Sequence, residues 1–388
     1  MLSGVLAGEK QEYDYIIAGA GAAGLSLLVR MIKSGNFTGK RILLVEKEPK
    51  IQNDRTWCFW ETGDGFFEEQ VFKAWPVLHF HSADFSAKLN IAPFKYKMIR
   101  GIDFYRYCFT LITSQPGITI KYGIVTEMHS DGASTWLLLD GIKYTAHYIF
   151  NSIILSDPKI GIWRYFLLQH FKGWVIETAA PVFKVEEATL MDFRVGQQSG
   201  TTFVYVMPFS PTKALVEYTL FSKELLQPHE YAKALHEYIR QNLGIDSYTI
   251  ESEEYGCIPM TDHKFSRQQG NIIQMGTVGG QTKASSGYTF QFIQKHTASI
   301  IEGLNKGGQL HNRLMSSKKY QFYDHVLLNV LATAKMPGDK VFIQLFKNNP
   351  PQRIFRFLDN ESSLREDVQL IASLPTLPFL KAGLQQIF

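Results

Sequence analysis

Six residues near the N-terminus constrain the fold of this 388-residue chain more than any other feature. They form the run Gly19-Ala20-Gly21-Ala22-Ala23-Gly24. An apolar segment at 13–18 precedes the run, a helix-like segment at 25–32 follows it, and a second apolar segment occupies 41–46. Short continuous apolar runs are typical of buried parallel strands. This part of the chain is therefore predicted to be a βαβ unit with the G-x-G-x-x-G fingerprint of dinucleotide-binding domains.

Each glycine of the fingerprint has its own expected task. Gly19 makes the tight turn, Gly21 lets the backbone approach a pyrophosphate, and Gly24 allows the helix to pack closely on the strand. The helix N-terminus adds a dipole and free N–H groups that favour phosphate. We therefore expect the cofactor to be contacted by Gly19, Ala20, Gly21, Ala23 and Gly24.

Glu46 closes the second apolar segment, where its carboxylate would accept hydrogen bonds from an adenosine ribose. It lies 27 positions after Gly19, and the long connection at 34–40 explains why this exceeds the usual spacing of about 20. Val125, at the end of an expected strand over 118–125, is a further candidate cofactor contact. The alternative, a chance glycine turn, would leave the strand, helix and acid around it unexplained.

A second glycine-rich loop at 276–288 joins an expected strand at 270–276 to an expected helix at 290–304. Large flavoproteins make their second flavin contact with a strand, a glycine-rich loop and a helix N-terminus. Most redox members place Asp directly after the last glycine of the strand, whereas this chain has Thr277. Either the loop contacts flavin or it only packs two elements together. The candidate contacts are Gly276, Gly279, Gly280, Ser286, Gly287 and Tyr288.

The rest of the pattern predicts an α/β fold with α+β elements, namely a Rossmann-like domain of the large flavoprotein type interrupted by an antiparallel sheet. Segments at 53–97, 136–148 (with a turn at Lys143) and 182–221 indicate strands, and 202–207 with 214–221 forms a hairpin. Segment 225–243 indicates a helix. The expected domains are a dinucleotide-binding domain (12–75, 98–160 and 250–310), an antiparallel-sheet substrate domain (76–97 and 161–249) and a helical region (311–388).

Charge and cysteine content exclude several partners. The net charge is only +4 and nothing collects into a basic run, so nucleic acid is not expected to bind. The three cysteines, Cys58, Cys108 and Cys257, are widely spaced, which indicates neither a disulfide framework nor a zinc site. His79, His81 and His296 also lack a metal-ligand spacing. We therefore expect no bound metal.

The chain resembles the lycopene cyclases of the carotenoid pathway, bacterial β-cyclase type, along nearly its whole length. The shared landmarks occur in the order of the family and include, besides the fingerprint, Asn53-Asp54-Arg55-Thr56-Trp57, Met191-Asp192, Pro208-Phe209-Ser210-Pro211-Thr212, Leu215-Val216-Glu217-Tyr218-Thr219, Gly256-Cys257-Ile258-Pro259-Met260, Ser286-Gly287-Tyr288, Phe322-Tyr323-Asp324 and Phe355-Arg356-Phe357-Leu358-Asp359.

The resemblance implies an isomerase, of the intramolecular lyase type, that turns the ψ ends of lycopene and related linear carotenes into β-ionone rings. The products would be γ-carotene and β-carotene. It also implies bound FAD, active in the reduced form with NAD(P)H as reductant, and no net redox change. The position that matches the acid/base glutamate of related cyclases is Glu217.

The residues around Glu217 support that role independently. Strand alternation puts Leu215, Glu217 and Thr219 on one face. Among apolar neighbours, desolvation would raise the pKa of Glu217 and keep its carboxyl protonated, as a general acid requires. The alternative is an edge-strand glutamate that faces water. Aromatic side chains, which include 28 Phe and 18 Tyr, would line the core or a polyene slot with cation-stabilising rings.

Two other functions use the same features. One is an FAD-dependent monooxygenase or reductase that acts on an apolar substrate, and the other is a carotenoid-binding flavoprotein without catalysis. No signal sequence and no apolar stretch of about 20 residues is present. We therefore expect a cytoplasmic protein that lies peripherally on the inner face of the membrane. The apolar tail at 374–388 would anchor it or pack as core, and Lys318-Lys319 would attract anionic headgroups.

Overall fold

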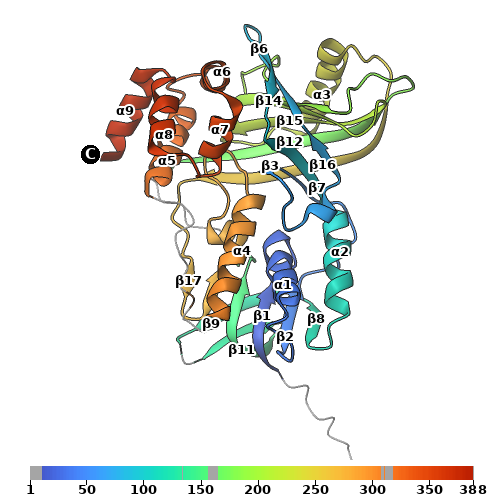
Figure 1. Ribbon diagram of the computed structural model, residues 1–388, viewed down its shortest axis with the longest axis vertical. Coiled ribbons are helices and arrows are strands. Elements are labelled where there is room, and N and C mark those ends of the chain that lie inside the picture. The colour runs from blue at the N-terminus through green and yellow to red at the C-terminus, as the bar shows by residue number, and fades with distance from the viewer. Residues whose placement is uncertain (1–10, 133, 156–164, 307–309, 311–317, 388) are drawn as a thin grey trace, which may run out of the picture.

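A computed structural model describes residues 11–132, 134–155, 165–306, 310 and 318–387, and its elements form three parts (Figure 1). The first is an eight-stranded sheet with strand order β17-β18-β11-β1-β2-β8 and the pair β9 and β10 beside β11. Its strands are β1 (Glu12–Ala18), β2 (Ile42–Glu46), β8 (Ile118–Tyr122), β9 (Val125–Ser130), β10 (Thr135–Leu139), β11 (Ile142–Asn151), β17 (Gln268–Gln269) and β18 (Ile272–Gln274).

Three helices cover one face of this sheet, namely α1 (Ala22–Ser34), α2 (Gly101–Thr113) and α4 (Phe290–Asn305). Leu28, Phe104 and Ile293 bring the three helices into one buried cluster with β1 and β2. Strands β9 and β10 pack on the opposite face. The predicted βαβ unit is confirmed because β1 pairs in parallel with β2 and α1 joins them. The turn between β10 and β11 lies at Asp140-Gly141, both with positive φ, rather than at Lys143.

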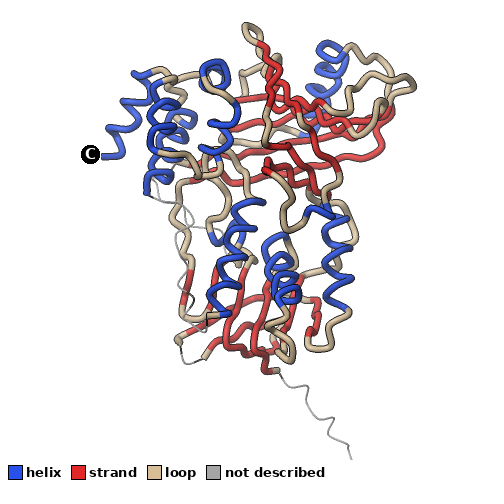
Figure 2. Tube along the Cα trace, viewed as in Figure 1, coloured by secondary structure: helices blue, strands red, loops and turns tan. Residues whose placement is uncertain are grey.

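The second part is a seven-stranded, mainly antiparallel sheet with strand order β16-β12-β15-β14-β13-β5-β6. Its strands are β5 (Val77–His81), β6 (Ser86–Asn90), β12 (Phe166–Glu177), β13 (Glu187–Asp192), β14 (Thr201–Pro208), β15 (Lys213–Ser222) and β16 (Thr249–Thr261). Strands β14 and β15 form the predicted hairpin, and α3 (Pro228–Leu243) is the predicted helix. Figure 2 shows this sheet lying across the ends of α1, α2 and α4.

Residues 249–261 belong to the second sheet, because β16 pairs with β12 over nearly its whole length. The boundary that the sequence suggests at residue 250 therefore falls at the start of a strand that extends the antiparallel sheet. We propose that the division lies after Thr261 instead. A small sheet of β3 (Thr56–Thr62), β4 (Lys73–Trp75) and β7 (Phe94–Arg100) also packs against the second sheet, beside the short helix η1 (Glu68–Gln70).

The third part is helical, as predicted, over the described residues from 318 onward. It comprises α5 (Lys318–Ala332), α6 (Gly338–Asn348), α7 (Pro351–Leu358), α8 (Leu364–Ala372) and α9 (Thr376–Ile387). Phe342 and Phe355 pack with Phe80 and Phe203 in one core. This contact fixes the helices to one end of the second sheet.

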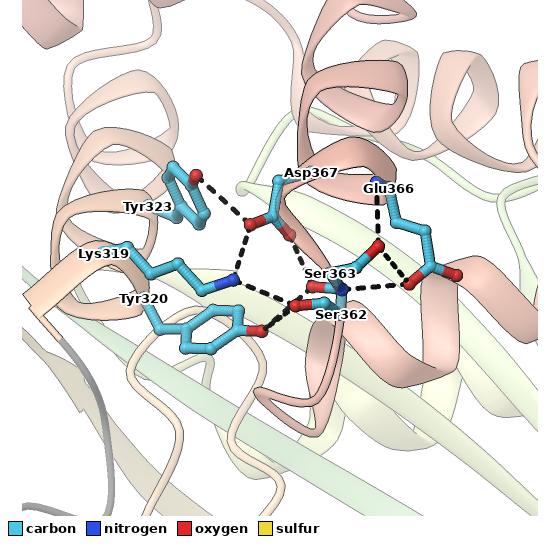
Figure 3. Close-up of polar contacts among 7 residues, drawn as sticks. All are labelled: Lys319, Tyr320, Tyr323, Ser362, Ser363, Glu366 and Asp367. Atoms are coloured by element: carbon cyan, nitrogen blue, oxygen red, sulfur yellow. Dashed lines mark hydrogen bonds and ion pairs between the residues drawn. The ribbon is translucent and has the colours of Figure 1, made fainter.

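A buried polar cluster ties α8 to α5 (Figure 3). Ser363 caps α8 by accepting a hydrogen bond from the Glu366 backbone N–H. One turn later, the buried Asp367 carboxylate accepts a hydrogen bond from Lys319 Nζ at 2.7 Å. Lys319 also donates to the Ser362 carbonyl at 2.9 Å. Lys319 is thus paired with a buried carboxylate, whereas Lys318 beside it is exposed. The expectation that Lys318-Lys319 attracts anionic headgroups stays a prediction.

Candidate functional site

A cavity of about 490 Å³ lies between the loops of the first part and the second sheet. The N-terminal turn of α1 and the loop before α4 line one side of it, and strands β12, β14, β15 and β16 line the other. Of the predicted site residues, seven line this cavity, namely Gly21, Ala23, Glu217, Gly276, Ser286, Gly287 and Tyr288. The fold therefore brings both glycine loops and the candidate acid to one site.

The first glycine loop has the geometry that the fingerprint requires. Gly19 has φ +100°, a conformation that favours glycine. A Cβ on Gly24 would lie 2.0 Å from the Gly19 carbonyl oxygen, so α1 packs against the loop only with glycine there. In contrast, a Cβ on Gly21 would meet no atom within 4 Å, because this residue faces the open cavity. The surface beside Gly21 is the one that a pyrophosphate would occupy.

The remaining predicted contacts do not line the cavity. The Glu46 carboxylate accepts hydrogen bonds from the backbone N–H of Ala20 at 2.6 Å and of Lys47 at 2.9 Å. Glu46 therefore supports the first loop directly. Val125 is buried in the core on the far face of the first sheet. Gly19, Ala20, Gly24, Gly279 and Gly280 shape the two loops.

Polar atoms without partners lie on the second loop and on the strand β12 that faces it. Gly287 has φ +73°, and a Cβ there would lie 2.0 Å from Gln169 Oε1. Both Gln169 Oε1 and Ser286 Oγ are buried and make no hydrogen bond. Leaving such groups unpaired costs free energy, and polar groups of a bound ligand would satisfy them. The open face at Gly21 and these atoms fit a dinucleotide that spans the two loops.

Glu217 lies in the interior of the second sheet, since β15 is flanked by β12 and β14. Its neighbours Val216 and Tyr218 pack under α3, as the predicted alternation requires. Glu217 itself points into the cavity and is 8% exposed. It is therefore not an edge-strand glutamate that faces water.

The surroundings of Glu217 favour its protonated form. Burial is the main cause that raises its pKa well above the usual range, and the neighbouring Glu254 charge raises it further. The Thr219 hydroxyl, 2.9 Å from Glu217 Oε1, acts in the opposite direction by donating a hydrogen bond. Since desolvation dominates, this carboxyl can hold a proton at its buried position on the cavity wall.

Glu254 on β16 is a site residue that the sequence analysis missed. Its Oε2 accepts a hydrogen bond from the Thr56 hydroxyl at 2.6 Å, whereas its Oε1 is buried without a partner. Gly173 on β12 is the register partner of both Glu217 and Glu254. Only knowledge of this strand pairing could have singled out Glu254 among four neighbouring polar residues at 251–254.

Aromatic side chains form much of the remaining wall. They include Trp57, Tyr96, Phe171, Tyr205, Tyr288 and Phe290. Burial raises the pKa of Tyr96 and of Tyr205 well above the usual value, so both rings stay neutral. Neutral aromatic faces stabilise a cation without attacking it. Among the described residues, no group of three or more His, Cys, Asp or Glu side chains is placed to hold a metal ion.

Comparison with known sequences matches a family model to most of the chain. The sequence model of the family described as "Lycopene cyclase protein" matches residues 14–384. A lycopene beta-cyclase from Pantoea ananas is 23% identical over 401 residues, which covers 97% of this chain and 98% of that protein. A lycopene beta-cyclase from a Paracoccus species is 25% identical over 224 residues, covering 54% of this chain and 57% of that protein.

Solved structures confirm the expected fold class. A flavoprotein/dehydrogenase from Cytophaga hutchinsonii superimposes with a TM-score of 0.61 at 13% identity and covers 97% of this chain and 99% of that one. A geranylgeranyl bacteriochlorophyll reductase-like protein from Thermoplasma acidophilum gives a TM-score of 0.57 at 12% identity, covering 96% and 95%. At these identities the likeness shows a shared fold.

The raised pKa of Glu217 predicts how stability depends on pH. A carboxyl whose folded pKa exceeds its unfolded value contributes stability below the unfolded pKa and loses it as pH rises toward the folded pKa. Glu217→Gln should therefore gain stability relative to the unaltered chain, by several degrees in Tm, as pH rises from roughly 4 to 9. Thermal unfolding across this pH range measures the effect.

Glu253→Gln is the matched control, because Glu253 is adjacent to the pair, 52% exposed and paired with Lys172. It should show no comparable gain at high pH. If the Tm of Glu217→Gln depended on pH in the same way as the Tm of the unaltered chain, the raised pKa of Glu217 would be contradicted.

Proposed function

The chain belongs to the lycopene cyclase family, and from that premise we propose that it converts the ψ ends of lycopene and related linear carotenes into β-ionone rings. The reaction would be an isomerisation without net redox change. The observation that carries this proposal is the Glu217 carboxyl, which burial keeps protonated inside an aromatic-walled cavity. A cyclase needs such an acid and must exclude water from the cation that it forms.

Each step uses groups that line the cavity. Glu217 delivers its proton to the C1=C2 bond of the ψ end, which leaves a cation at C1. The C5=C6 bond attacks C1 and closes the ring, and the ring cation then loses its C6 proton. Tyr205 and Phe171 lie on strands next to Glu217 and present their rings to the same cavity. Their faces stabilise the transient positive charge.

FAD is the cofactor that family and fold support, and the residues of the site fit it. Gly21 leaves room for the pyrophosphate, while Gln169 and Ser286 offer polar atoms without partners on the opposite side. The N-termini of α1 and α4 face the same space. When bound in its reduced form, with NAD(P)H as reductant, FAD would supply electron density that stabilises a nearby cation, or a proton.

Thr277 and Glu217 argue against the two alternative functions. Thr277 stands where an FAD-dependent monooxygenase or reductase would be expected to carry Asp, and such an enzyme would consume NAD(P)H in proportion to product. A carotenoid-binding protein without catalysis gives no reason to bury an ionisable group in its ligand cavity at a cost in stability. Glu217 would then be dispensable.

Gly21→Val tests the cofactor assignment. Because no atom lies within 4 Å of a Cβ at this position, the variant should fold. Its side chain would fill the space beside the helix N-terminus and abolish flavin retention. Flavin absorbance per protein after purification measures flavin retention, and circular dichroism shows whether the variant folds. Full flavin occupancy in folded Gly21→Val protein would overturn the assignment.

Glu217→Gln tests the catalytic assignment. Glutamine keeps the shape of the side chain but cannot deliver a proton, so ring formation should fall at least about 100-fold. Flavin content should remain normal. The measurement is the rate of β-carotene formation from lycopene with reduced FAD, and Glu253→Gln should retain full activity. Near-normal ring formation by Glu217→Gln would remove this residue from the mechanism.

We also propose that the outer face of α8 and α9 rests on the membrane that holds the substrate. Within the described part of the chain, no helix combines the length and apolarity needed to cross a bilayer. Six exposed side chains instead form an apolar stripe on these helices: Leu364, Val368, Ile371, Leu377, Leu380 and Leu384. In contrast, Asp367, Leu370 and Ala382 face inward. One face of these two helices therefore packs as core, and the other face is the surface that we propose rests on the membrane.

A triple variant of α9, Leu377→Ser, Leu380→Ser and Leu384→Ser, should reduce co-sedimentation with anionic liposomes severalfold while leaving flavin content unchanged. Added salt should weaken binding only slightly, because Lys319 is engaged by Asp367. The control replaces the exposed Ile51, Ile124 and Ile142 with Ser and should bind liposomes normally. Unchanged liposome binding by the folded α9 variant would reject this surface.

A further inference from the structure

We propose that Glu254 is a second catalytic residue, which shares one proton with Glu217 and accepts the C6 proton that ends ring formation. The inference rests on the proposed cyclisation but concerns a residue outside the family landmarks. Glu254 is placed beside Glu217 by strand pairing, and both line the same cavity.

The register of three strands brings the two carboxyl groups together. Gly173 on β12 pairs with Glu217 of β15 on one side and with Glu254 of β16 on the other. Directly paired residues of neighbouring strands point to the same face, so both glutamates extend over Gly173. A Cβ at Gly173 would lie 2.9 Å from Glu254 Cγ and 3.1 Å from Glu254 Oε1. The absence of a side chain there lets the two carboxyl groups meet across the intervening strand.

The hydrogen bonds of the two carboxyl groups leave one oxygen, Glu254 Oε1, without a donor. The Thr56 hydroxyl donates a hydrogen bond to Glu254 Oε2, and the Thr219 hydroxyl donates one to Glu217 Oε1. Glu254 Oε1 is buried and accepts no hydrogen bond from any described group. A proton carried by Glu217 would supply one, since both side chains extend over Gly173 into the same cavity. A single shared proton therefore satisfies an oxygen that is otherwise left unpaired.

The charges around the pair favour one proton rather than none. The other titratable groups that interact with the pair are Cys58 on β3 and Tyr205 on β14. Burial is the main cause that raises the pKa of each, so both remain neutral. Two cations line the same cavity, but Lys50 lies 3.8 Å from Glu46 and Arg55 donates to the Asp54 carbonyl. In the described part of the chain, no salt bridge joins a cation to either glutamate.

The shared proton closes the reaction cycle without a co-reactant. At the start Glu217 carries the proton and Glu254 is a carboxylate. Glu217 protonates the ψ end, the C1–C6 bond forms, and the Glu254 carboxylate removes the C6 proton as the ring double bond forms. Glu254 is then protonated and Glu217 ionised, and passage of this proton from Glu254 to Glu217 restores the starting state. Between the two transfers, two carboxylates face one cation.

Glu254→Gln tests the role in catalysis, because the amide oxygen can still accept the Thr56 hydrogen bond but cannot take a proton. Formation of β rings should fall about 100-fold. The rings that still form should carry their double bond elsewhere, because the cation loses a different proton. Pigment analysis measures both, with Glu253→Gln as the control. A rate of β-ring formation within about twofold of the unaltered chain would overturn the proposal.

Thermal unfolding tests the shared proton without any turnover. Glu254→Gln removes the like charge beside Glu217, so stability should fall less steeply than in the unaltered chain as pH rises. The gains of Glu217→Gln and Glu254→Gln at high pH should not add in the double variant. Additive stability gains in the double variant would overturn the shared proton. An unchanged pH dependence of stability in Glu254→Gln would overturn it as well. If the unaltered chain forms no rings, the proposed function fails. The thermal unfolding data would still decide whether the two carboxyl groups share a proton.

Discussion

The desolvation of one carboxyl group, that of Glu217, is the constraint on which the site depends. An ionised carboxylate is costly away from water, so burial of this side chain favours its protonated form. Three features surround the cavity. The second sheet supplies the floor, the aromatic residues on β3, β7 and β14 supply the walls, and the loop before α4 covers the remaining side. The placement of the second sheet against the loops of the first part thus determines the acidity of a single side chain.

The same junction explains why one cavity combines a dinucleotide fingerprint with an acid. In open α/β sheets, ligands bind outside the carboxyl ends of the parallel strands. Here the antiparallel sheet is placed at that end, so Gly21 and Glu217 face a common space. The helical region packs on the far end of the second sheet through Phe342 and Phe355, which leaves α8 and α9 free to present apolar side chains outward.

Local patterns were sufficient to predict the parts of the fold that depend on neighbouring residues. The βαβ unit, the β14–β15 hairpin and α3 follow from apolar periodicity and turn residues, and alternation along β15 correctly placed Glu217 on the face opposite Val216. Pairing between distant strands could not be predicted in this way. The assignment of β16 to the second sheet and the approach of Glu254 to Glu217 both depend on the register with β12. The ion pair between Lys319 and Asp367 could not be predicted for a similar reason, since the two residues are distant in sequence.

The central claim is that this site performs acid catalysis without net oxidation or reduction. The most direct test incubates the purified protein anaerobically with reduced FAD and lycopene, and follows the pigments together with the flavin spectrum. The account predicts that lycopene is converted to isomeric pigments with β rings over many turnovers while the flavin stays reduced. Hydroxylated or hydrogenated pigment formed in proportion to the flavin oxidised, or to NAD(P)H consumed, would contradict it.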